Sequence, residues 1–431
     1  MRAIKSRLIF MNFLQFAVWG SYLTSMGGYL FAKGEGDMIG WFYAMQGVVS
    51  IFMPAIMGII ADKWMPAQRL LGLCHAIAAI FIAAAGYFAS SDMIVPMFAL
   101  YSVSVAFYMP TLALSNSVAY TSLEIGGYDT VKAFPPIRVF GTVGFIVAML
   151  ICDFAGFQAN HIQFYQCALI GVAMSLFTLL LPNCPVSNSV GNKSLMQRLG
   201  LDAFKLFKSK QMAMFFIFSM LLGVSLQITN GFANGFITSF KNLPEFANTF
   251  GANHANALIS LSQVSETLCI LLIPICLKRL GIKWVMLIAM FAWVLRFGLF
   301  GLGNPGDGLW MFILSMIVYG VAFDFFNISG SLFVNENTSG EMRSSAQGLF
   351  MIMTNGIGAT VGTLSAQAVV NKFVPFEIKN AEQVVTNGNA IAEGWSHTWL
   401  IFAGYALVVA LLFWVLFKYK HNPDKMVDIK H

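Results

Sequence analysis

The chain has 431 residues, of which 58% are hydrophobic and only 10% are charged, and its mean hydropathy is +0.73. This composition excludes an ordinary soluble domain, and its long apolar runs favour helices, which satisfy their own backbone hydrogen bonds in lipid. The net charge of +6 does not indicate a nucleic-acid partner, because the basic residues lie mainly in short segments between apolar runs. We therefore expect an all-α polytopic membrane protein surrounded by the lipid bilayer.

Twelve apolar runs are each long enough to cross a bilayer as a helix. The polar stretch 183–210 separates six of them from the other six. This pattern predicts an N-terminal six-helix bundle at 1–182, a cytoplasmic linker at 183–210, and a C-terminal six-helix bundle with a short cytoplasmic tail at 211–431. The expected spans are 8–31, 38–61, 68–89, 92–117, 137–157, 160–181, 212–238, 252–276, 283–303, 308–334, 343–371 and 396–417.

Basic residues are distributed unevenly between the two sides of the predicted bundle. Of the 25 Lys and Arg residues, 19 fall on the side of the N-terminus and four on the opposite side. Because cytoplasmic loops are enriched in Lys and Arg, both termini are predicted to be cytoplasmic. The first apolar run lacks a small-residue cleavage site, so we expect it to remain as an uncleaved helix.

Two loops at corresponding places in the halves resemble the signature loops of the major facilitator superfamily. They are Gly58–Lys63, with Arg69 beyond it, and Lys278–Lys283. The first departs from the usual pattern, because Trp64–Pro66 stands where a Gly-containing turn is common. Together with the six-plus-six arrangement, the loops predict the major facilitator fold, with a substrate site near the bilayer midplane at the interface of the halves.

The predicted fifth span carries a polar face. It opens at Pro135 and Pro136, which suit the first turn of a helix. Arg138, Thr142 and Phe145 follow at helical spacing on one side. A guanidinium, a hydroxyl and an aromatic ring can hold a polar, planar solute. The alternative is an arginine that extends to the inner membrane surface, and the spacing alone favours neither reading.

Amide and carboxyl side chains recur in the second half. Gln227 and Asn230 are three residues apart in the seventh span, and Gln263 and Glu266 have the same spacing in the eighth. One such pair alone would more often join neighbouring helices. Their convergence in one half instead favours a hydrogen-bonding cavity for a neutral, flat, hydroxyl-rich molecule.

Asp324 lies near the middle of the apolar run 309–334. A carboxylate there costs roughly 2.5–3.5 kcal/mol on insertion scales unless it is protonated, paired or facing water. It shares a helix face with Gly320 and Asn327, and its flanks are Phe323, Phe325 and Phe326. The alternative is a buried acid satisfied by neighbouring helices, but intramembrane acids usually mark a proton or substrate path, which we favour here.

Arg296 lies in the middle of the ninth span and requires a partner. We expect it to pair with Glu266 or Asp324 when that acid is ionised, and to be released when the acid is protonated. Asp324 is the preferred proton site. His75, at the apolar start of the third span, is expected to be structural, and Gly358-x-x-x-Gly362 to allow close helix packing.

Enzyme and metal motifs are missing from the sequence. The six cysteines form no C-x-x-C pair, so neither a disulfide nor a metal site is predicted. There is no H-E-x-x-H, Gly-x-Ser-x-Gly or phosphate-loop Gly-Lys. The stretch Gly34–Asp37 matches the Gly-x-Gly-Asp of intramembrane aspartyl proteases, but it lies in a predicted outer loop without a preceding Tyr-Asp partner. We expect neither enzymatic activity nor a cofactor.

Long blocks of the chain resemble the nucleoside:proton symporter family of the major facilitator superfamily. The blocks are Phe13–Phe16, Ala61–Trp64, Tyr108–Leu112, Phe134–Arg138, Leu226–Asn230, Ser262–Thr267, Tyr319–Ser331 and Arg343–Gly348. The resemblance implies proton-driven import of purine and pyrimidine nucleosides across the cell inner membrane by alternating access. It also implies a site lined by Arg138, Thr142, Gln227, Asn230, Gln263, Glu266 and Asp324.

A sugar substrate is the alternative. The stretch Arg138–Gly144 is also similar to the fifth span of the lactose-type oligosaccharide:proton symporters. We expect a monomer in either case. Phe145, Tyr319, Phe323 and Asn327 complete the predicted substrate face, while Arg296 belongs with Asp324 and Glu266 to proton coupling.

Overall fold

The computed structural model describes residues 2–186, 201–338, 342–375 and 387–419, and these residues form helices and no strand. The chain divides into two compact units. The first comprises the described residues of Met1–Tyr29 and Met45–Leu199, and the second those of Leu30–Ala44 and Gly200–His431. The predicted bundles differ from this division at Leu30–Ala44, which packs with the second unit. Much of the predicted linker, at 187–200, lies outside the described residues.

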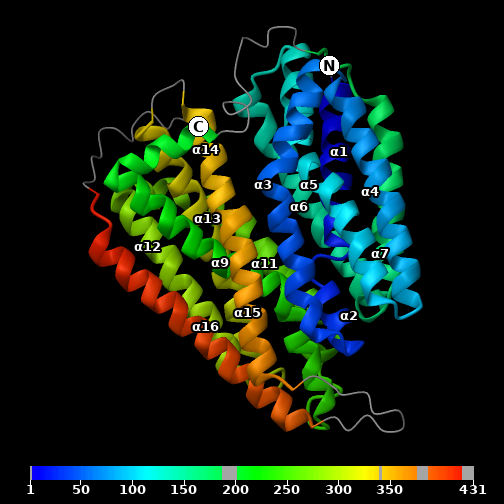
Figure 1. Ribbon diagram of the computed structural model, residues 1–431, viewed down its shortest axis with the longest axis vertical. Helices are drawn as coiled ribbons and strands as arrows, with labels where there is room; N and C mark the ends of the chain where they lie inside the picture. Colours follow the sequence, from blue (N-terminus) through cyan, green and yellow to red (C-terminus); the bar gives the residue numbers. More distant parts are fainter. Residues whose placement is uncertain (1, 187–200, 339–341, 376–386, 420–431) are drawn as a thin grey trace. The chain divides into compact units, whose positions relative to one another are not determined.

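The helices of the first unit are α1, α4, α5, α6 and α7, with parts of α2 and α3 (Figure 1). Their bounds are α1 Arg2–Gly20, α2 Met26–Ala32, α3 Ile39–Lys63, α4 Ala67–Ser90, α5 Ile94–Ile125, α6 Thr130–Phe154 and α7 Ile162–Phe177, with short 3-10 helices at Phe157–Ala159 and Thr178–Leu180. The 3-10 helix at Gly36–Met38, between α2 and α3, belongs to the second unit. In this unit α4 packs against α5 and α7, and α1 packs against α6.

The second unit holds the remaining helices. Their bounds are α9 Lys210–Ser239, α10 Phe250–Asn253, α11 Ala255–Ile270, α12 Ile273–Leu302, α13 Leu309–Glu336, α14 Arg343–Met351, α15 Ala359–Phe373 and α16 Gly388–Leu416, with 3-10 helices at Leu201–Lys208 and Phe240–Asn242 and a π-helix at Ile352–Gly358. Within it, α13 packs against α11 and α12, α12 packs against α16, and α9 packs against α15.

Ten helical stretches in the described part of the chain are long and apolar enough to cross a membrane. The expected first and eighth spans are not among them. The first is divided into α1 and α2 by a turn at residues 21–25, and the eighth ends at Ile270, where the chain turns before α12. Both contain polar residues that form hydrogen bonds inside the bundle, such as Ser25 to Gln163 and Ser262 to the Met316 sulfur.

Helices α5, α6 and α16 extend beyond the limits of the predicted spans. Helix α6 begins at Thr130, so Pro135 and Pro136 lie inside it rather than at its start. Helix α5 continues to Ile125, and α16 begins at Gly388, inside the expected outer loop. The α16 start has a local cause, because the Asn387 side chain accepts a hydrogen bond from the Ala390 amide at 3.2 Å and so caps the helix.

Gly281 lies where the second signature loop was predicted. Its φ of 79° and ψ of 167° interrupt the helical geometry of α12. Glycine adopts a positive φ without a steric penalty, whereas other residues rarely do. The segment Ile273–Leu302 therefore consists of two helical pieces that meet at this glycine.

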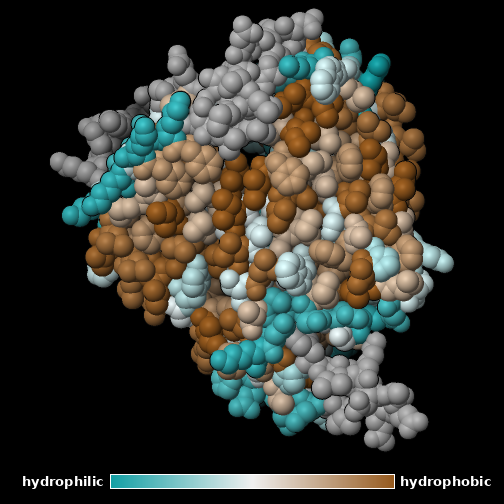
Figure 2. Space-filling view, viewed as in Figure 1, coloured by the Kyte–Doolittle hydropathy of each residue, from teal (hydrophilic) through white to brown (hydrophobic). Residues whose placement is uncertain are grey.

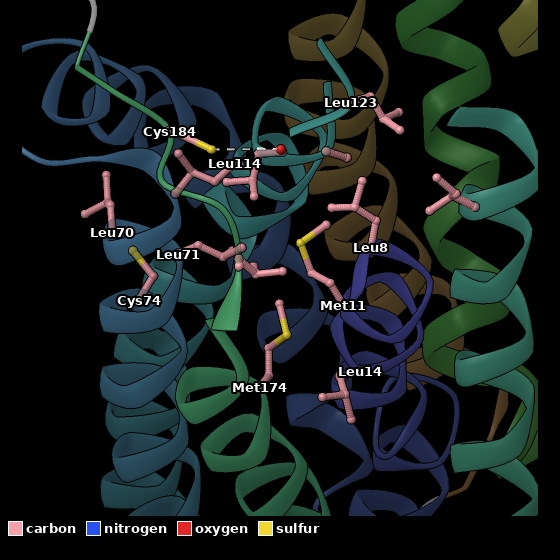
Figure 3. Packing of buried hydrophobic residues seen from close by; sticks show 14 of the residues in the cluster. Leu8, Met11, Leu14, Leu70, Leu71, Cys74, Leu114, Leu123, Met174 and Cys184 are labelled. Atoms are coloured by element: carbon pink, nitrogen blue, oxygen red, sulfur yellow. Dashed lines mark hydrogen bonds between the residues drawn. The ribbon is translucent and has the colours of Figure 1, made fainter. Parts of the chain in front are cut away.

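A hydrophobic core joins the helices of the first unit at one end (Figure 3). Leu8 and Met11 of α1 face Leu71 of α4 and Met174 of α7 across it. Cys184, just after α7, places its sulfur 4.0 Å from the Val118 carbonyl oxygen of α5. Transfer of one large apolar side chain from water to such a core is favourable by about 1.5–3 kcal/mol. Between helices surrounded by lipid, van der Waals packing is the main stabilising contribution.

Glycines allow backbones to touch at several helix crossings. At Gly144 of α6 an added Cβ would overlap the Phe13 carbonyl of α1. At Gly362 of α15 it would lie 2.5 Å from the Val224 Cα of α9, and at Gly358 it would overlap the Met220 carbonyl. The prediction that Gly358 and Gly362 serve close helix packing is therefore confirmed.

Gln367 of α15 binds the start of α3. Its Oε1 accepts the Gly40 amide at 2.5 Å, and its Nε2 donates to the Gly36 carbonyl at 2.9 Å and to Asn371 Oδ1 at 2.6 Å. The Gly40 amide lies in the first turn of α3, where helix geometry supplies no acceptor. Gln367 thus caps α3 from α15, and this contact ties the start of α3 to a helix of the second unit.

Apolar side chains cover much of the exterior. Figure 2 shows hydrophobic residues over most of the visible face, with strongly hydrophilic residues gathered toward its upper and lower ends. Large apolar side chains such as Leu169 and Leu179 are 72% and 77% exposed. Such exposure is unfavourable in water but is expected of helices that face lipid.

Candidate functional site

The two acids of the second unit lie along the contact between α11 and α13. Gly320 of α13 packs on α11, where an added Cβ would lie 2.5 Å from the Ser265 carbonyl oxygen. The Ser265 hydroxyl also donates to the Ile317 carbonyl of α13. Glu266 follows Ser265 in the sequence and is half-buried, whereas Asp324, one turn beyond Gly320, is only 5% exposed.

Electrostatic contacts place both acids near the same aromatic ring. The Tyr319 phenol interacts with Glu266, Arg296 and Asp324, and the Cys269 thiol of α11 interacts with Asp324. The structure therefore brings together three ionisable residues that the sequence placed on separate helices.

Tyr319 is held by rings on two sides. Its ring stacks on Phe323, with centroids 5.6 Å apart and an interplanar angle of 5°. The Trp293 ring of α12 meets it edge-on, at 5.9 Å and 88°. This packing holds the Tyr319 and Phe323 rings parallel beside the acids.

Arg296 is 2% exposed, and its guanidinium is held by neutral groups. Nη1 donates to the Ser315 carbonyl at 2.6 Å and lies 3.5 Å from the Ser262 hydroxyl. The guanidinium carbon lies 4.7 Å from the Tyr319 ring centroid and 5.2 Å from that of Phe300. Burying a cation is costly, and these carbonyl and ring contacts offset part of that cost.

The expected pairing of Arg296 with an acid is not made in this structure, since within the described chain its guanidinium contacts no carboxylate. Helix geometry gives the reason for Asp324. Ser315, which binds Arg296, precedes Asp324 by nine residues on α13, a rise of about 13 Å. Glu266 is nearer, because it lies one turn beyond Ser262 on α11.

The predicted amides of α9 bind each other. Asn230 Nδ2 donates to Gln227 Oε1 at 2.6 Å, with Gln227 buried and Asn230 half-buried. This bond aligns two amides on one face of a single helix. On α11, Gln263 is half-buried and its side chain forms no hydrogen bond within the described residues, so its amide is available to a ligand. Asn327 of α13 is likewise half-buried.

In the first unit, Arg138 bends over helix α1. Its guanidinium carbon lies 3.9 Å from the centre of the Phe16 ring. Gly141 makes room, because a Cβ there would lie 2.7 Å from both Arg138 Nη1 and the Phe16 ring. This contact disfavours the alternative of an arginine that extends to the membrane surface.

The other two residues of that face differ in their contacts. The Phe145 ring meets Trp19 of α1 edge-on, with centroids 6.4 Å apart and an angle of 89°. Thr142 is half-buried one turn beyond Arg138. Arg138, Thr142 and Phe145 therefore share one face of α6 that lies against α1, as their spacing predicted.

Sequence reasoning missed the groups that hold Arg296. They are the Ser262 hydroxyl, the Ser315 backbone carbonyl and the rings of Phe300 and Tyr319. The available signal was weak, since it consisted of single serines within apolar spans, and a backbone carbonyl has no sequence signature at all.

The comparisons with known proteins cover almost the whole chain. A family model described as nucleoside H+ symporter matches residues 2–422. The chain belongs to the nucleoside H+ symporter family. It is 47% identical to nucleoside permease NupG of Escherichia coli (strain K12) over 421 residues, which cover 97% of each chain. It is 46% identical to the xanthosine permease of the same organism over 432 residues, covering 100% of this chain and 99% of the other.

A solved structure of this symporter family has the same fold. The crystal structure of the nucleoside transporter NupG superposes with a TM-score of 0.86 at 47% identity, covering 97% of this chain and 100% of that one. The predictions of a helical major facilitator fold, of the nucleoside:proton symporter family and of a transporter rather than an enzyme are therefore confirmed.

Proposed function

We propose that this symporter imports purine and pyrimidine nucleosides together with protons across the cell inner membrane, working as a monomer by alternating access with both termini in the cytoplasm. The observation that carries the proposal is the joint position of Glu266 and Asp324 along the α11–α13 contact, beside the stacked rings of Tyr319 and Phe323. A proton site and a stacking surface for a base thus belong to the same few helix turns.

The polar groups around these rings suit the ribose and the edges of a base. Gln263 and Asn327 are half-buried, and the Gln227–Asn230 pair offers further donors and acceptors. These side chains are uncharged, which suits a neutral solute better than a phosphorylated one. The substrates in the names of the two relatives, nucleosides and xanthosine, support the same class.

The α6 face is proposed to contact the substrate as well. Arg138 and Thr142 can donate hydrogen bonds, and Phe145 presents a ring edge-on to Trp19. An arginine already stacked on Phe16 has lost part of its hydration and much of its rotamer freedom, so it loses less on binding a solute.

For proton coupling we propose Asp324 as the main proton site. It is the more deeply buried of the two acids, and acids inside membrane spans usually mark a proton or substrate path. Glu266 is half-buried and is proposed to contact substrate. Of the two acids, Glu266 is also the one that Arg296 reaches with the smaller movement, since Arg296 already contacts Ser262 one turn away.

Uptake into proteoliposomes tests this function. Radiolabelled uridine, adenosine, xanthosine and lactose are supplied with and without an inward proton gradient. We expect accumulation of the nucleosides only with the gradient, and no accumulation of lactose. Lactose accumulation would replace the nucleoside proposal with the sugar alternative, and gradient-independent nucleoside accumulation would contradict proton coupling.

A further inference from the structure

A buried polar cluster in the first unit lies outside the predicted substrate residues. Gln15 comes from α1, His75 from α4, and Tyr108 and Thr111 from α5. Tyr108 is 2% exposed and the other three are fully buried. Polar groups at this depth are unfavourable unless they are hydrogen-bonded, so the bonds among them determine their protonation and orientation.

The orientation of the Gln15 amide follows from Thr111. The Thr111 hydroxyl donates its single proton to the Tyr108 carbonyl at 2.5 Å. Thr111 Oγ1 can therefore only accept from Gln15, whose Nε2 lies 2.7 Å away. The amide nitrogen faces Thr111, and Gln15 Oε1 is left to face His75.

This orientation in turn fixes the His75 tautomer. His75 Nε2 lies 2.8 Å from Gln15 Oε1, which can only accept. A neutral His75 must then carry its proton on Nε2 and leave a lone pair on Nδ1. Nδ1 is buried and has no hydrogen-bond partner within the described residues.

A small cavity adjoins His75. Its volume is about 10 Å³, and its lining includes Ser104 and Tyr108 together with apolar groups. That volume is sufficient for the centre of one water molecule. The Ser104 hydroxyl donates to the Ala78 carbonyl at 2.8 Å, and the Tyr108 hydroxyl donates to the Gln15 carbonyl at 2.8 Å. Both oxygens keep lone pairs, so each can accept a further hydrogen bond.

We propose that this cavity binds one ordered water, which donates hydrogen bonds to His75 Nδ1 and to Ser104 Oγ. The neutral His75 held in this way is a positioning residue for the proposed substrate face of α6, which Arg138, Thr142 and Phe145 form. A water with two protons matches two acceptors, whereas an apolar solute would leave Nδ1 without a partner. The other titratable groups lining the cavity are Tyr22, Tyr108 and Cys167. Among the described residues that line it there is no carboxylate that would stabilise an imidazolium.

The positioning role acts through α1, and it rests on the proposed substrate role of Arg138 and Phe145. His75 holds Gln15, which directly precedes the Phe16 ring beneath Arg138. Trp19, one turn after Gln15, has its ring 6.0 Å from Tyr108 and 6.4 Å from Phe145. Loss of the His75–Gln15 bond would free α1 to shift beneath both α6 residues.

Solid-state nitrogen NMR on the full chain labelled with [15N]histidine tests the water and the tautomer independently of transport. The His75→Gln variant assigns the signal among the six histidines. We expect a proton on Nε2, a hydrogen-bonded Nδ1 that receives magnetisation from water, and no titration between pH 5 and 8. Ser104→Ala should change the Nδ1 signal. A proton on Nδ1, a signal that titrates, the absence of transfer from water, or an Nδ1 signal unchanged by Ser104→Ala would overturn this part of the proposal.

Uridine binding and uptake test the positioning role. His75→Leu removes the bond to Gln15, and we expect about a fivefold to tenfold weaker affinity, with the pH profile of uptake unchanged. His75→Gln retains an N–H donor and should recover most of the affinity, and the exposed His397→Gln serves as control. Unchanged affinity in folded His75→Leu, or a changed pH profile, would overturn positioning. If His75→Leu does not fold, Gln15→Leu provides the same comparison, because it removes the same bond from the other side.

Discussion

Arg296 and Ser315 bind each other in both directions. Arg296 Nη1 donates to the Ser315 carbonyl at 2.6 Å, and the Ser315 hydroxyl donates to the Arg296 carbonyl at 3.0 Å. The two bonds join the C-terminal half of α12 to α13 and leave the guanidinium against Tyr319. A buried cation is thus held by a backbone carbonyl and aromatic rings, and the Tyr319 phenol beside it also interacts with Glu266 of α11.

Replacing Arg296 should therefore affect both stability and transport. Arg296→Gln leaves the Ser315 carbonyl without its charged donor and removes the contact with Tyr319. We expect a loss of about 1–3 kcal/mol of stability and reduced gradient-driven uptake. Ser315→Ala removes only the hydroxyl bond and should cost about 1 kcal/mol with uptake largely kept. Thermal unfolding and uridine uptake measured on the same preparations check both values, and equal effects of the two variants would contradict the special position of Arg296.

Asp324→Asn should separate substrate exchange from proton coupling. The amide mimics the protonated acid in shape and charge, so nucleoside binding and counterflow are expected to persist while accumulation driven by a proton gradient is lost. Counterflow and gradient-driven uptake are measured in the same proteoliposomes, with Glu266→Gln as the matched variant. Accumulation of uridine by Asp324→Asn in response to protons would show that Asp324 is not the coupling residue and would make Glu266 the leading candidate.

The hydrogen bond between Gln227 and Asn230 predicts how the two single variants compare with the double variant. Gln227→Ala or Asn230→Ala should each weaken uridine binding about tenfold, because each leaves a polar group of the site unpaired. If the two amides act as one unit, the double variant should bind only slightly less tightly than either single variant. Calorimetry gives the affinities, and Thr238→Ala on the same helix is the control. Unchanged affinity in both single variants would assign these amides to helix packing.

Gly362→Ala tests the contact between α9 and α15. The new methyl group would lie 2.5 Å from the Val224 backbone, which cannot rotate away. We expect a loss of about 1–3 kcal/mol of stability from overpacking. Gly404→Ala on α16 is the matched control, because no atom lies within 4 Å of the added Cβ. The control should be neutral or slightly stabilising, since alanine favours helices by about 1 kcal/mol over glycine. Equal melting temperatures for the two variants would contradict the close contact.

The orientation in the membrane is tested by reporter fusions. Fusions after Ser187 and at the C-terminus, both outside the described residues, should report the cytoplasm, because 19 of the 25 basic residues lie on that side of the predicted spans. A reporter active only outside the cytoplasm, at either point, would contradict this orientation.

The sequence alone determined the class of the protein and most of its candidate site. Apolar runs long enough to cross a bilayer can only form helices there, so ten of the twelve predicted spans correspond to helices that are long and apolar enough to cross a membrane. Polar residues are costly in such runs, which is why Arg138, Gln227, Glu266, Arg296 and Asp324 stood out without a structure. Helical spacing also showed which residues share a face, as with Arg138, Thr142 and Phe145.

Partners across helices were decided only by the tertiary structure. The spacing along one helix does not specify which neighbour it meets or at what height, and a backbone carbonyl such as that of Ser315 leaves no trace in the sequence. Arg296 was therefore expected to pair with an acidic side chain, but its guanidinium is instead held by the Ser315 carbonyl and the Tyr319 ring. Likewise, only the packing of α1, α4 and α5 brought His75 to Gln15, because the bond depends on three helices meeting at one depth.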